Sequence, residues 1–258
     1  MKKTILEKTA DKLVNAFVNN KIIAPLPIKF TKTLSEAQKL RKLCESKVKD
    51  PIVGFKAAGT GIPVMKKLKE KKPFYAAIFK KNFIKSGKKV KINKSTLGIE
   101  LEVCYLIKKN FFSSKGLITT KNITKHISHM AACIEVIGYR QKKKGITSFG
   151  DLCSDFGANV KFLIGQKKKY KKINIGNLKT NIANKKIGQS INGNTNTVYI
   201  NPLNSLRFVL NELKKDKVTL DKDFYVFTGS TVGVVPILGK GLYTGKIAKL
   251  GSAKAIIH

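Results

Sequence analysis

The stretch LGIELEVCYLI, residues 97–107, alternates in the way that a β-strand requires. Ile99, Leu101 and Val103 fall on one face of this strand, whereas Glu100 and Glu102 fall on the other. Side chains at positions i and i+2 are about 6 to 7 Å apart, because each strand residue rises by about 3.3 Å. Two carboxylates this close in an apolar segment need a cation, since their charges repel each other and burial is unfavourable.

The strand itself contains no cation, since no lysine lies between Lys94 and Lys108. Carboxylate oxygens are the ligands that Mg²⁺ and Mn²⁺ prefer, so the glutamate pair is consistent with a divalent metal site. The alternative is an exposed strand face whose glutamates pair with lysines of neighbouring strands. The spacing alone does not decide between these two interpretations.

The composition is that of an ordered globular protein. With 258 residues, 42% of them hydrophobic, the chain can bury a substantial core. No apolar run reaches the roughly 18 residues that a membrane helix needs, and acidic residues interrupt any signal-peptide region at the start. The cysteines show no CxxC spacing, which favours reduced, buried thiols: Cys44, Cys104, Cys133 and Cys153. These features predict a soluble, cytoplasmic protein.

The charge balance is strongly basic, with 52 Lys+Arg against 15 Asp+Glu and a formal net charge of +37. Such an excess usually points to nucleic acid. However, arginine, which makes bidentate contacts with bases and phosphates, occurs only at Arg41, Arg140 and Arg207, and the lysines are scattered. We therefore expect a solvated lysine-rich surface, no specific nucleic-acid partner and no membrane partner. A basic polyanion-binding protein stays open as the non-enzymatic alternative.

Hydrophobic periodicity predicts an N-terminal helical subdomain over residues 1–48 and a larger domain over 49–258, together forming one compact unit. Helices are expected over 4–20, 34–47, 64–70 and 122–132 and from Pro202 onward, with Thr33 or Ser35 and Asn201 as N-caps. Strands are expected over 51–58, 74–79, 97–107, 133–139, 160–164, 224–228 and 243–257. Many strands without regular βαβ alternation predict an α+β fold, with a mixed β-roll or barrel-like sheet flanked by helices.

Further polar residues stand alone in apolar segments. Glu135 lies in the strand CIEVI, and with Glu100 and Glu102 it could form one face of an octahedral metal site. Lys56 is isolated in its strand and is expected either to reach the sheet edge or to pair with a carboxylate or a substrate anion. Asp155 either orients this lysine, or moves protons, or caps a helix.

These residues occur in segments that resemble a known family across nearly the whole chain. The segments are GFKAAGT, LGIELEV, ACIEVIGYR, DLCSDFGANVKFLIG, NPLNSLRFVLNEL and DKDFYVFTGS. In order and spacing they are similar to the 2-keto-4-pentenoate hydratase and 4-oxalocrotonate decarboxylase family of the fumarylacetoacetate hydrolase superfamily. The resemblance implies a mixed β-roll flanked by helices, Mg²⁺ or Mn²⁺ as cofactor, and a homo-oligomer.

The resemblance also implies a role for each matching residue. The implied metal ligands are Glu100, Glu102 and Glu135, the implied catalytic residues are Lys56 and Asp155, and the implied substrate-binding residues are Arg140, Thr228, Gly229 and Ser230. Several polar positions of the family pattern differ in this chain, where Phe74, Phe156, Ala158, Asn159 and Asn201 stand. The metal face is therefore retained, while groups that would meet the substrate are changed.

The implied activity is that of a metal-dependent lyase in aromatic catabolism. The leading expectation is a hydratase that acts on a short unsaturated 2-keto or 2-hydroxydienoic acid through an enolate held on the metal. Decarboxylation of an unsaturated 2-oxo diacid uses the same enolate and is the alternative. An acylpyruvate-type hydrolase is less favoured, because His126, His129 and His258 all lie outside the N-terminal region. A silent relative that keeps only the metal site is the remaining possibility.

Overall fold

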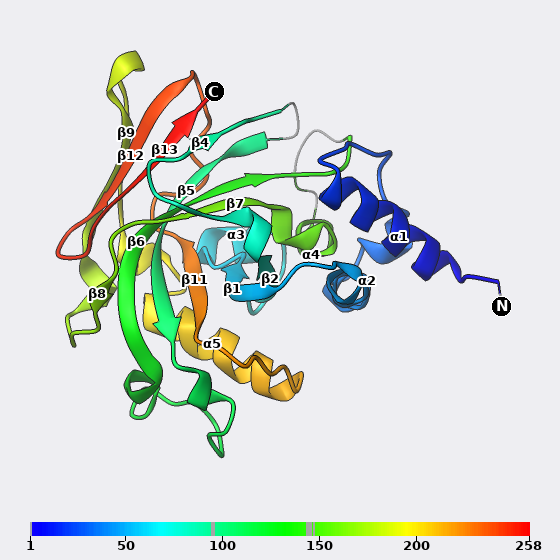
Figure 1. Cartoon of the computed structure of the whole chain (residues 1–258), viewed down its shortest axis with the longest axis horizontal. Helices are drawn as coiled ribbons and strands as arrows, with labels where there is room; N and C mark the ends of the chain where they lie inside the picture. Colours follow the sequence, from blue (N-terminus) through cyan, green and yellow to red (C-terminus); the bar gives the residue numbers. More distant parts are fainter. Residues whose placement is uncertain (1, 94–95, 143–145, 147) are drawn as a thin grey trace.

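The computed structural model describes the chain except for residues 1, 94–95, 143–145 and 147 (Figure 1). Its larger sheet has the order β2-β1-β11-β5-β6-β7-β3, with β8 paired to β6, and its smaller sheet has the order β10-β9-β12-β13-β4. The strands of the larger sheet are β1 (Ile52–Ala58), β2 (Phe74–Phe79), β3 (Phe83–Lys85), β5 (Thr96–Ile107), β6 (Ile127–Gly138), β7 (Asn159–Ile164), β8 (Lys168–Lys169) and β11 (Phe224–Ser230). The strands of the smaller sheet are β4 (Lys89–Val90), β9 (Lys179–Asn184), β10 (Gln189–Asn194), β12 (Gly241–Ile247) and β13 (Gly251–Ile257).

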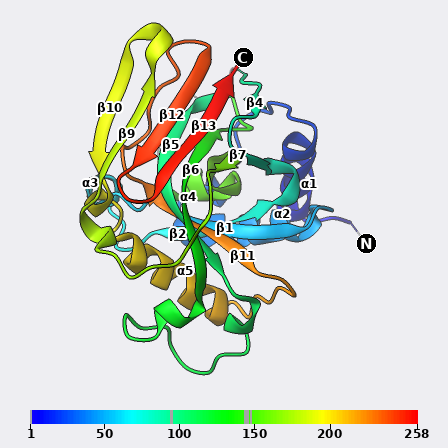
Figure 2. The ribbon, with the colours of Figure 1, turned by 60° about the vertical axis from the view of Figure 1, so that its left-hand side comes forward.

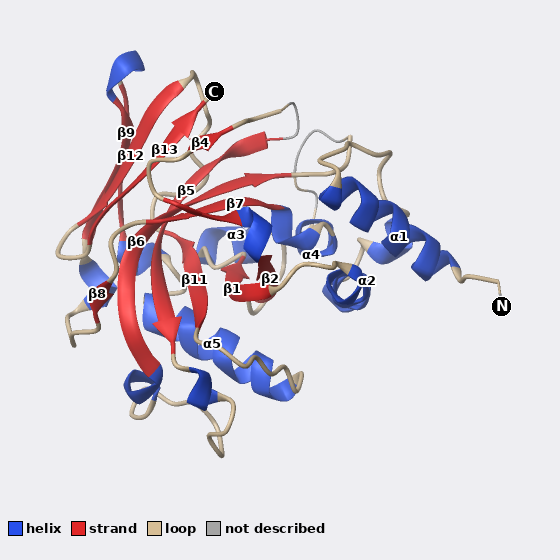
Figure 3. Ribbon diagram, viewed as in Figure 1, coloured by secondary structure: helices blue, strands red, loops and turns tan. Residues whose placement is uncertain are grey.

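The two sheets curl around a shared core and helices flank them, with α1, α2 and α5 on the outside and α4 buried, which confirms the predicted α+β roll (Figures 2 and 3). The α-helices are α1 (Ile5–Val18), α2 (Leu34–Lys47), α3 (Ile62–Lys67), α4 (Phe149–Ser154) and α5 (Pro202–Lys215). No helix among the described residues is both long and apolar enough to span a membrane. All four cysteines are buried as free thiols, as expected.

The predicted helix starts are confirmed where a side chain caps the backbone. Thr33 accepts a hydrogen bond from the Glu36 N–H at the start of α2, and Asn201 accepts one from the Leu203 N–H at the start of α5. The apolar stripes of the three long helices face the core. Their buried members include Ala10, Leu13 and Phe17 of α1, Ala37, Leu40 and Cys44 of α2, and Leu206, Val209, Leu210 and Leu213 of α5.

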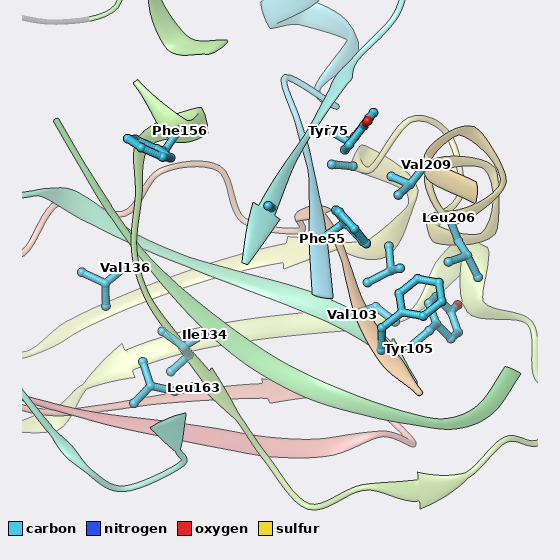
Figure 4. Close-up of a cluster of buried hydrophobic side chains, with 14 of the residues drawn as sticks. Phe55, Tyr75, Val103, Tyr105, Ile134, Val136, Phe156, Leu163, Leu206 and Val209 are labelled. Atoms are coloured by element: carbon cyan, nitrogen blue, oxygen red, sulfur yellow. The ribbon is translucent and has the colours of Figure 1, made fainter. Parts of the chain in front are cut away.

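Strand β5 occupies the middle of the larger sheet and has the predicted alternation. Ile99, Leu101 and Val103 are fully buried in the main core, on the face opposite to the two glutamates. Farther along, Val103 and Tyr105 lie near Phe55 of β1 and Leu206 and Val209 of α5 (Figure 4). This packing fixes the register of β5 and therefore the side to which its carboxylates point.

The helix expected over residues 122–132 is wrong. Only a 3₁₀ turn, Ile123–His126, forms there, and β6 begins directly afterwards at Ile127. The segment HMAA has helix-forming residues, but its backbone pairs with β5, where Met130 lies opposite Tyr105 and Ala131 lies opposite Cys104. Pairing with a buried strand outweighs the local preference.

Phe156, which stands where the family pattern has a polar residue, belongs to the core. Its ring stacks on Phe17 of α1 with 4.1 Å between the ring centroids, and it is fully buried. The substitution thus joins the N-terminal helices to the loop that precedes β7. Contact between α2 and α4 reinforces this junction. Gly150 of α4 also lies against the segment before α2, where an added Cβ would be 2.3 Å from the Thr31 carbonyl oxygen.

Candidate metal centre and active-site pocket

Three carboxylates meet where β5 and β6 run antiparallel. Glu100 lies opposite Glu135 in the strand register, and Glu102 lies two residues farther along β5 on the same face. One oxygen from each carboxylate lies within 4.8 Å of the other two. Glu102 and Glu135 are buried, whereas Glu100 is partly exposed and lines a pocket. The structure therefore brings the three predicted ligands together.

Lys56 reaches this cluster from β1. Its ammonium nitrogen is 2.6 Å from Glu135 Oε1, and the residue is only 3% exposed. Of the two fates expected for this lysine, the structure selects pairing with a carboxylate. One cation among three carboxylates leaves an excess of negative charge in a buried site, which favours a further cation.

The hydrogen bonds of the glutamates also fit a site for a cation. Glu102 Oε2 accepts the Gly229 N–H at 2.8 Å. Among the described residues, Glu102 Oε1 and Glu135 Oε2 are buried without any donor. A buried carboxylate oxygen normally has a donor or a cation. Three carboxylates with free oxygens fit a hard divalent ion such as Mg²⁺ or Mn²⁺.

The pKa shifts of the clustered side chains also fit a site for a divalent ion. Burial and the charge of Glu135 raise the pKa of Glu100 to about 7, although Lys56 opposes the shift. Burial and the charges of the other two glutamates raise the pKa of Glu102 well above its usual value. Burial lowers the pKa of Lys56, but the three glutamate charges outweigh it and raise that pKa overall. A divalent ion would relieve this mutual repulsion.

Metal affinity is therefore expected to rise with pH. The raised pKa of Glu100, about 7, means that a proton competes with the metal below that pH and leaves above it. Calorimetric titration of Mg²⁺ at about pH 8 should show about tenfold tighter binding than at about pH 6. An affinity that does not change over this range would contradict the assignment of Glu100 as a ligand.

A pocket of about 190 Å³ opens beside the carboxylates. Glu100 and Lys56 form its polar end, together with Thr60, Gly229 and Ser230. Most of the remaining lining is small or apolar and includes Ala57, Ala58, Val64, Ile137, Ile146, Leu152, Gly157, Ala158 and Val234. Apart from Ala158, sequence reasoning missed these residues, because an apolar side chain that lines a pocket has the same pattern as one that fills a core.

The last residues of β11 lie in two different surroundings. Of the residues expected to bind substrate there, Gly229 and Ser230 line the pocket. Thr228 does not line it; this residue is buried, and its hydroxyl donates to the Val103 carbonyl at 2.8 Å. Gly229 has a φ of +107°, and a Cβ there would lie 1.9 Å from Thr60 Oγ1. Position 229 thus requires glycine so that the backbone N–H of this residue can reach Glu102.

Gly229→Ala is expected to weaken Mg²⁺ binding by at least about tenfold, because the clash with Thr60 would displace the N–H that orients Glu102. Gly233→Ala is the matched control, since Gly233 also has a positive φ, +73°, but an added Cβ meets nothing within 4 Å. Calorimetry on both variants measures the effect. Equal losses in the two variants would show that backbone strain alone, and not the contact with Glu102, is responsible.

Arg140 and Asp155 are not placed as the resemblance implied. Asp155 is fully buried, and its carboxylate accepts hydrogen bonds from Arg140 and Gln141, with no contact to Lys56. Neither Arg140 nor Asp155 lines the pocket. Asp155 does not reach Lys56 because the Lys56 ammonium is already paired with Glu135. Arg140, which follows the end of β6, lies next to Asp155 and pairs with it instead.

Comparisons with known proteins give matches in structure but none in sequence. No family model and no curated protein sequence matches the chain. Among solved structures, 4-oxalocrotonate decarboxylase from Pseudomonas putida G7, complexed with magnesium and adipate, matches with a TM-score of 0.83 and 19% identity over 100% of both chains. Fumarylpyruvate hydrolase from Pseudomonas aeruginosa, in complex with Mn²⁺ and pyruvate, matches with a TM-score of 0.58 and 13% identity over 82% of this chain and 91% of that one.

A third match, 5-carboxymethyl-2-hydroxymuconate delta-isomerase from Mycobacterium smegmatis, has a TM-score of 0.52 and 11% identity, over 81% of this chain and 80% of that one. The chain therefore shares the fold of these solved structures, which agrees with the fold that the resemblance implied. Within that fold it is similar over its full length to 4-oxalocrotonate decarboxylase, N-terminal helices included.

Proposed function

We propose that this chain is a metal-dependent lyase that hydrates a short unsaturated 2-keto acid or its 2-hydroxydienoic form. The observation that carries the proposal is the cluster of Glu100, Glu102 and Glu135, with two buried oxygens lacking donors, at the polar end of a pocket. These three residues would hold Mg²⁺ or Mn²⁺. When bound, the ion would supply Lewis-acid polarisation of the substrate carboxylate and 2-keto oxygen.

Lys56 is the protein group that meets the reacting end of the substrate. Its ammonium lies at the boundary between Glu135 and the pocket, so it can stabilise negative charge that develops on the 2-oxygen. It can also exchange a proton with the substrate there. Gly229 and Ser230 also line this end of the pocket, where the Gly229 N–H holds Glu102 in position.

The pocket walls favour a substrate with one carboxylate. Among the described lining residues Lys56 is the only cation, and the apolar part of the lining includes Val64, Ile137 and Leu152. The second carboxylate of a diacid would meet no further counter-ion among these described residues, and its desolvation against apolar side chains is costly. A short alkenyl tail would instead bury apolar surface there. This contrast favours hydration of a monoacid over decarboxylation of a diacid.

Decarboxylation is the second candidate, because the full-length structural match is to 4-oxalocrotonate decarboxylase. The test is a parallel assay of 2-keto-4-pentenoate hydration and of CO₂ release from 4-oxalocrotonate, each with Mg²⁺ and with a chelator. Hydration that requires Mg²⁺ is expected. Release of CO₂ without hydration would assign the decarboxylase, and neither reaction in a protein that binds Mg²⁺ would indicate a silent relative.

An acylpyruvate-type hydrolase is disfavoured by the positions of the histidines. His129 lies opposite Leu106 in the β5–β6 register, six residues along β6 from Glu135, which corresponds to about 20 Å. His126 precedes that strand, and His258 ends the chain. No histidine is among the described residues that line the pocket. Cleavage of an acylpyruvate by the protein would overturn this ranking.

We also infer that the protein acts in the cytoplasm, in aromatic catabolism, as a homo-oligomer with residues 1–48 as a helical subdomain. The support is the family resemblance together with the four buried free cysteines. The alternative of a basic polyanion-binding protein predicts tight association with nucleic acid at physiological salt. We expect such association only in dilute salt, because the net charge of +37 comes mainly from dispersed lysines.

A further inference from the structure

Arg140 and Asp155 form a buried ion pair behind the pocket. Arg140 Nε is 2.5 Å from Asp155 Oδ1, and the Arg140 backbone N–H donates to Asp155 Oδ2 at 2.7 Å. Two further donors of the same guanidinium reach backbone carbonyls: Nη2 donates to Asp155 O at 2.6 Å, and Nη1 donates to Asn159 O. One side chain therefore holds both ends of the segment 155–159.

The backbone between these two anchor points is strained. Phe156, Gly157 and Ala158 have φ values of 52°, 64° and 61°, three consecutive residues in the left-handed region. Residues other than glycine seldom adopt this conformation, and surrounding contacts must enforce it. The outer side of the loop is fixed as well, because Phe156 stacks on Phe17 and Asn159 Nδ2 donates to the Ala77 carbonyl at 2.8 Å.

The inner side of this loop touches the active-site lysine. Gly157 and Ala158 line the pocket, and a Cβ built on Gly157 would lie 3.4 Å from Lys56 Cε and 3.0 Å from the Ala76 Cβ. The backbone of the loop thus lies directly against the Lys56 stem. Any shift of the loop would release that stem or push it away from Glu135, and it would reshape the pocket wall.

We propose that Arg140 and Asp155 are positioning residues that hold the loop 156–158 against Lys56 and so fix the direction of its ammonium toward Glu135 and the substrate. This inference rests on the proposed function for the role of Lys56 in turnover. It differs from the roles expected from the sequence, in which Asp155 either holds Lys56 directly or moves protons, and Arg140 binds the substrate.

The surroundings of Asp155 oppose proton transfer by its carboxylate. Both carboxylate oxygens already accept hydrogen bonds from Arg140, and Oδ2 also accepts one from Gln141 Nε2 at 3.2 Å. Gln141 Oε1 in turn accepts the Leu26 N–H, which closes the network toward the N-terminal helices. The carboxylate is fully buried and outside the pocket lining, so a substrate proton has no direct path to it.

The test uses Asp155→Asn and Arg140→Lys, with Arg207→Lys on α5 as the matched control. Asparagine keeps the shape of Asp155 but removes the charge that holds the guanidinium, and lysine cannot bind Asp155 and Asn159 together. We expect kcat for hydration to fall by about 10- to 100-fold in both, with a smaller change in KM, an unchanged pH profile and unchanged Mg²⁺ affinity. Arg207→Lys should behave as the parent protein.

Gly157→Ala provides a variant that leaves the ion pair intact. Its added methyl group presses on Lys56 from the pocket side, so it should reproduce the loss in kcat while the protein remains folded. If Asp155 instead transfers protons, Asp155→Asn will remove one limb of the pH profile, and Gly157→Ala will not imitate it. That result, or full activity in both Asp155→Asn and Arg140→Lys, would overturn the proposal.

A second readout separates this proposal from the proposed function. The ¹⁵Nζ resonance of Lys56, assigned with a Lys56→Arg sample, reports the environment of the ammonium without any substrate. It should move in Asp155→Asn and Gly157→Ala but stay in place in Arg207→Lys. An inactive parent protein whose Lys56 resonance responds in this way would refute the lyase assignment alone. A Lys56 resonance that has the same chemical shift in all these variants would refute the positioning role of Arg140 and Asp155.

Discussion

Glu100→Gln is expected to lower the rate of Mg²⁺-dependent hydration by about 10³-fold or more, without loss of the fold. The substitution removes one of three negative charges that would bind the ion and keeps the size of the side chain. Glu100 lines the pocket and is partly exposed, so the core beneath it is not disturbed. Initial rates, Mg²⁺ calorimetry and thermal unfolding of the same preparation measure the effect.

The stability of the metal-free variant gives an independent check. Burial and the charge of Glu135 raise the pKa of Glu100 to about 7 in the folded protein, so the charged form of Glu100 opposes folding above that pH. Without metal at about pH 8, Glu100→Gln should therefore unfold at a temperature no lower than the parent protein does. Glu70→Gln, away from the site, is the control. Retained turnover together with unchanged Mg²⁺ affinity would contradict the metal site.

Lys56→Met is expected to lower turnover by about 10²- to 10⁴-fold, because the variant lacks the cation next to the reacting oxygen. It should also destabilise the metal-free protein, by about 3 kcal/mol, since it leaves Glu135 buried without its counter-ion. Protonation of Glu135 can relieve this loss at low pH, so the destabilisation should increase as the pH rises.

Metal should partly rescue that variant. A divalent ion bound by Glu100, Glu102 and Glu135 supplies positive charge where Lys56 supplied it. Mg²⁺ should therefore raise the unfolding temperature of Lys56→Met by more than it raises that of the parent protein. Lys115→Met, at an exposed position, serves as the control. An equal effect of Mg²⁺ on both proteins, or no destabilisation without metal, would refute the proposed electrostatics.

The parts of this molecule that sequence predicts well are those set by local patterns. The strict alternation of residues 97–107 fixes the two faces of β5, and the structure places Glu100 and Glu102 on one of them. The caps at Thr33 and Asn201 similarly mark the starts of α2 and α5. In each case the deciding residues lie within a few positions of one another.

The parts that sequence does not predict depend on partners far along the chain. β6 replaces the expected helix because β5 supplies its pairing edge, with Tyr105 opposite Met130. Asp155 joins Arg140 rather than Lys56, which Glu135 already pairs at a separation of 79 residues. The apolar pocket wall shows no pattern of its own, because only the folded backbone decides which apolar side chains face a cavity.

Calorimetric titration of oxalate, a mimic of the planar enolate of a 2-keto acid, tests the central claim most directly. It is done with and without Mg²⁺, on the parent protein and on Glu102→Gln. We expect oxalate binding that requires Mg²⁺ and is lost in Glu102→Gln, because the site for the keto acid would include the ion held by the three glutamates. Oxalate binding that does not depend on Mg²⁺, or that is retained in Glu102→Gln, would contradict the metal site and leave the glutamates as ordinary strand residues.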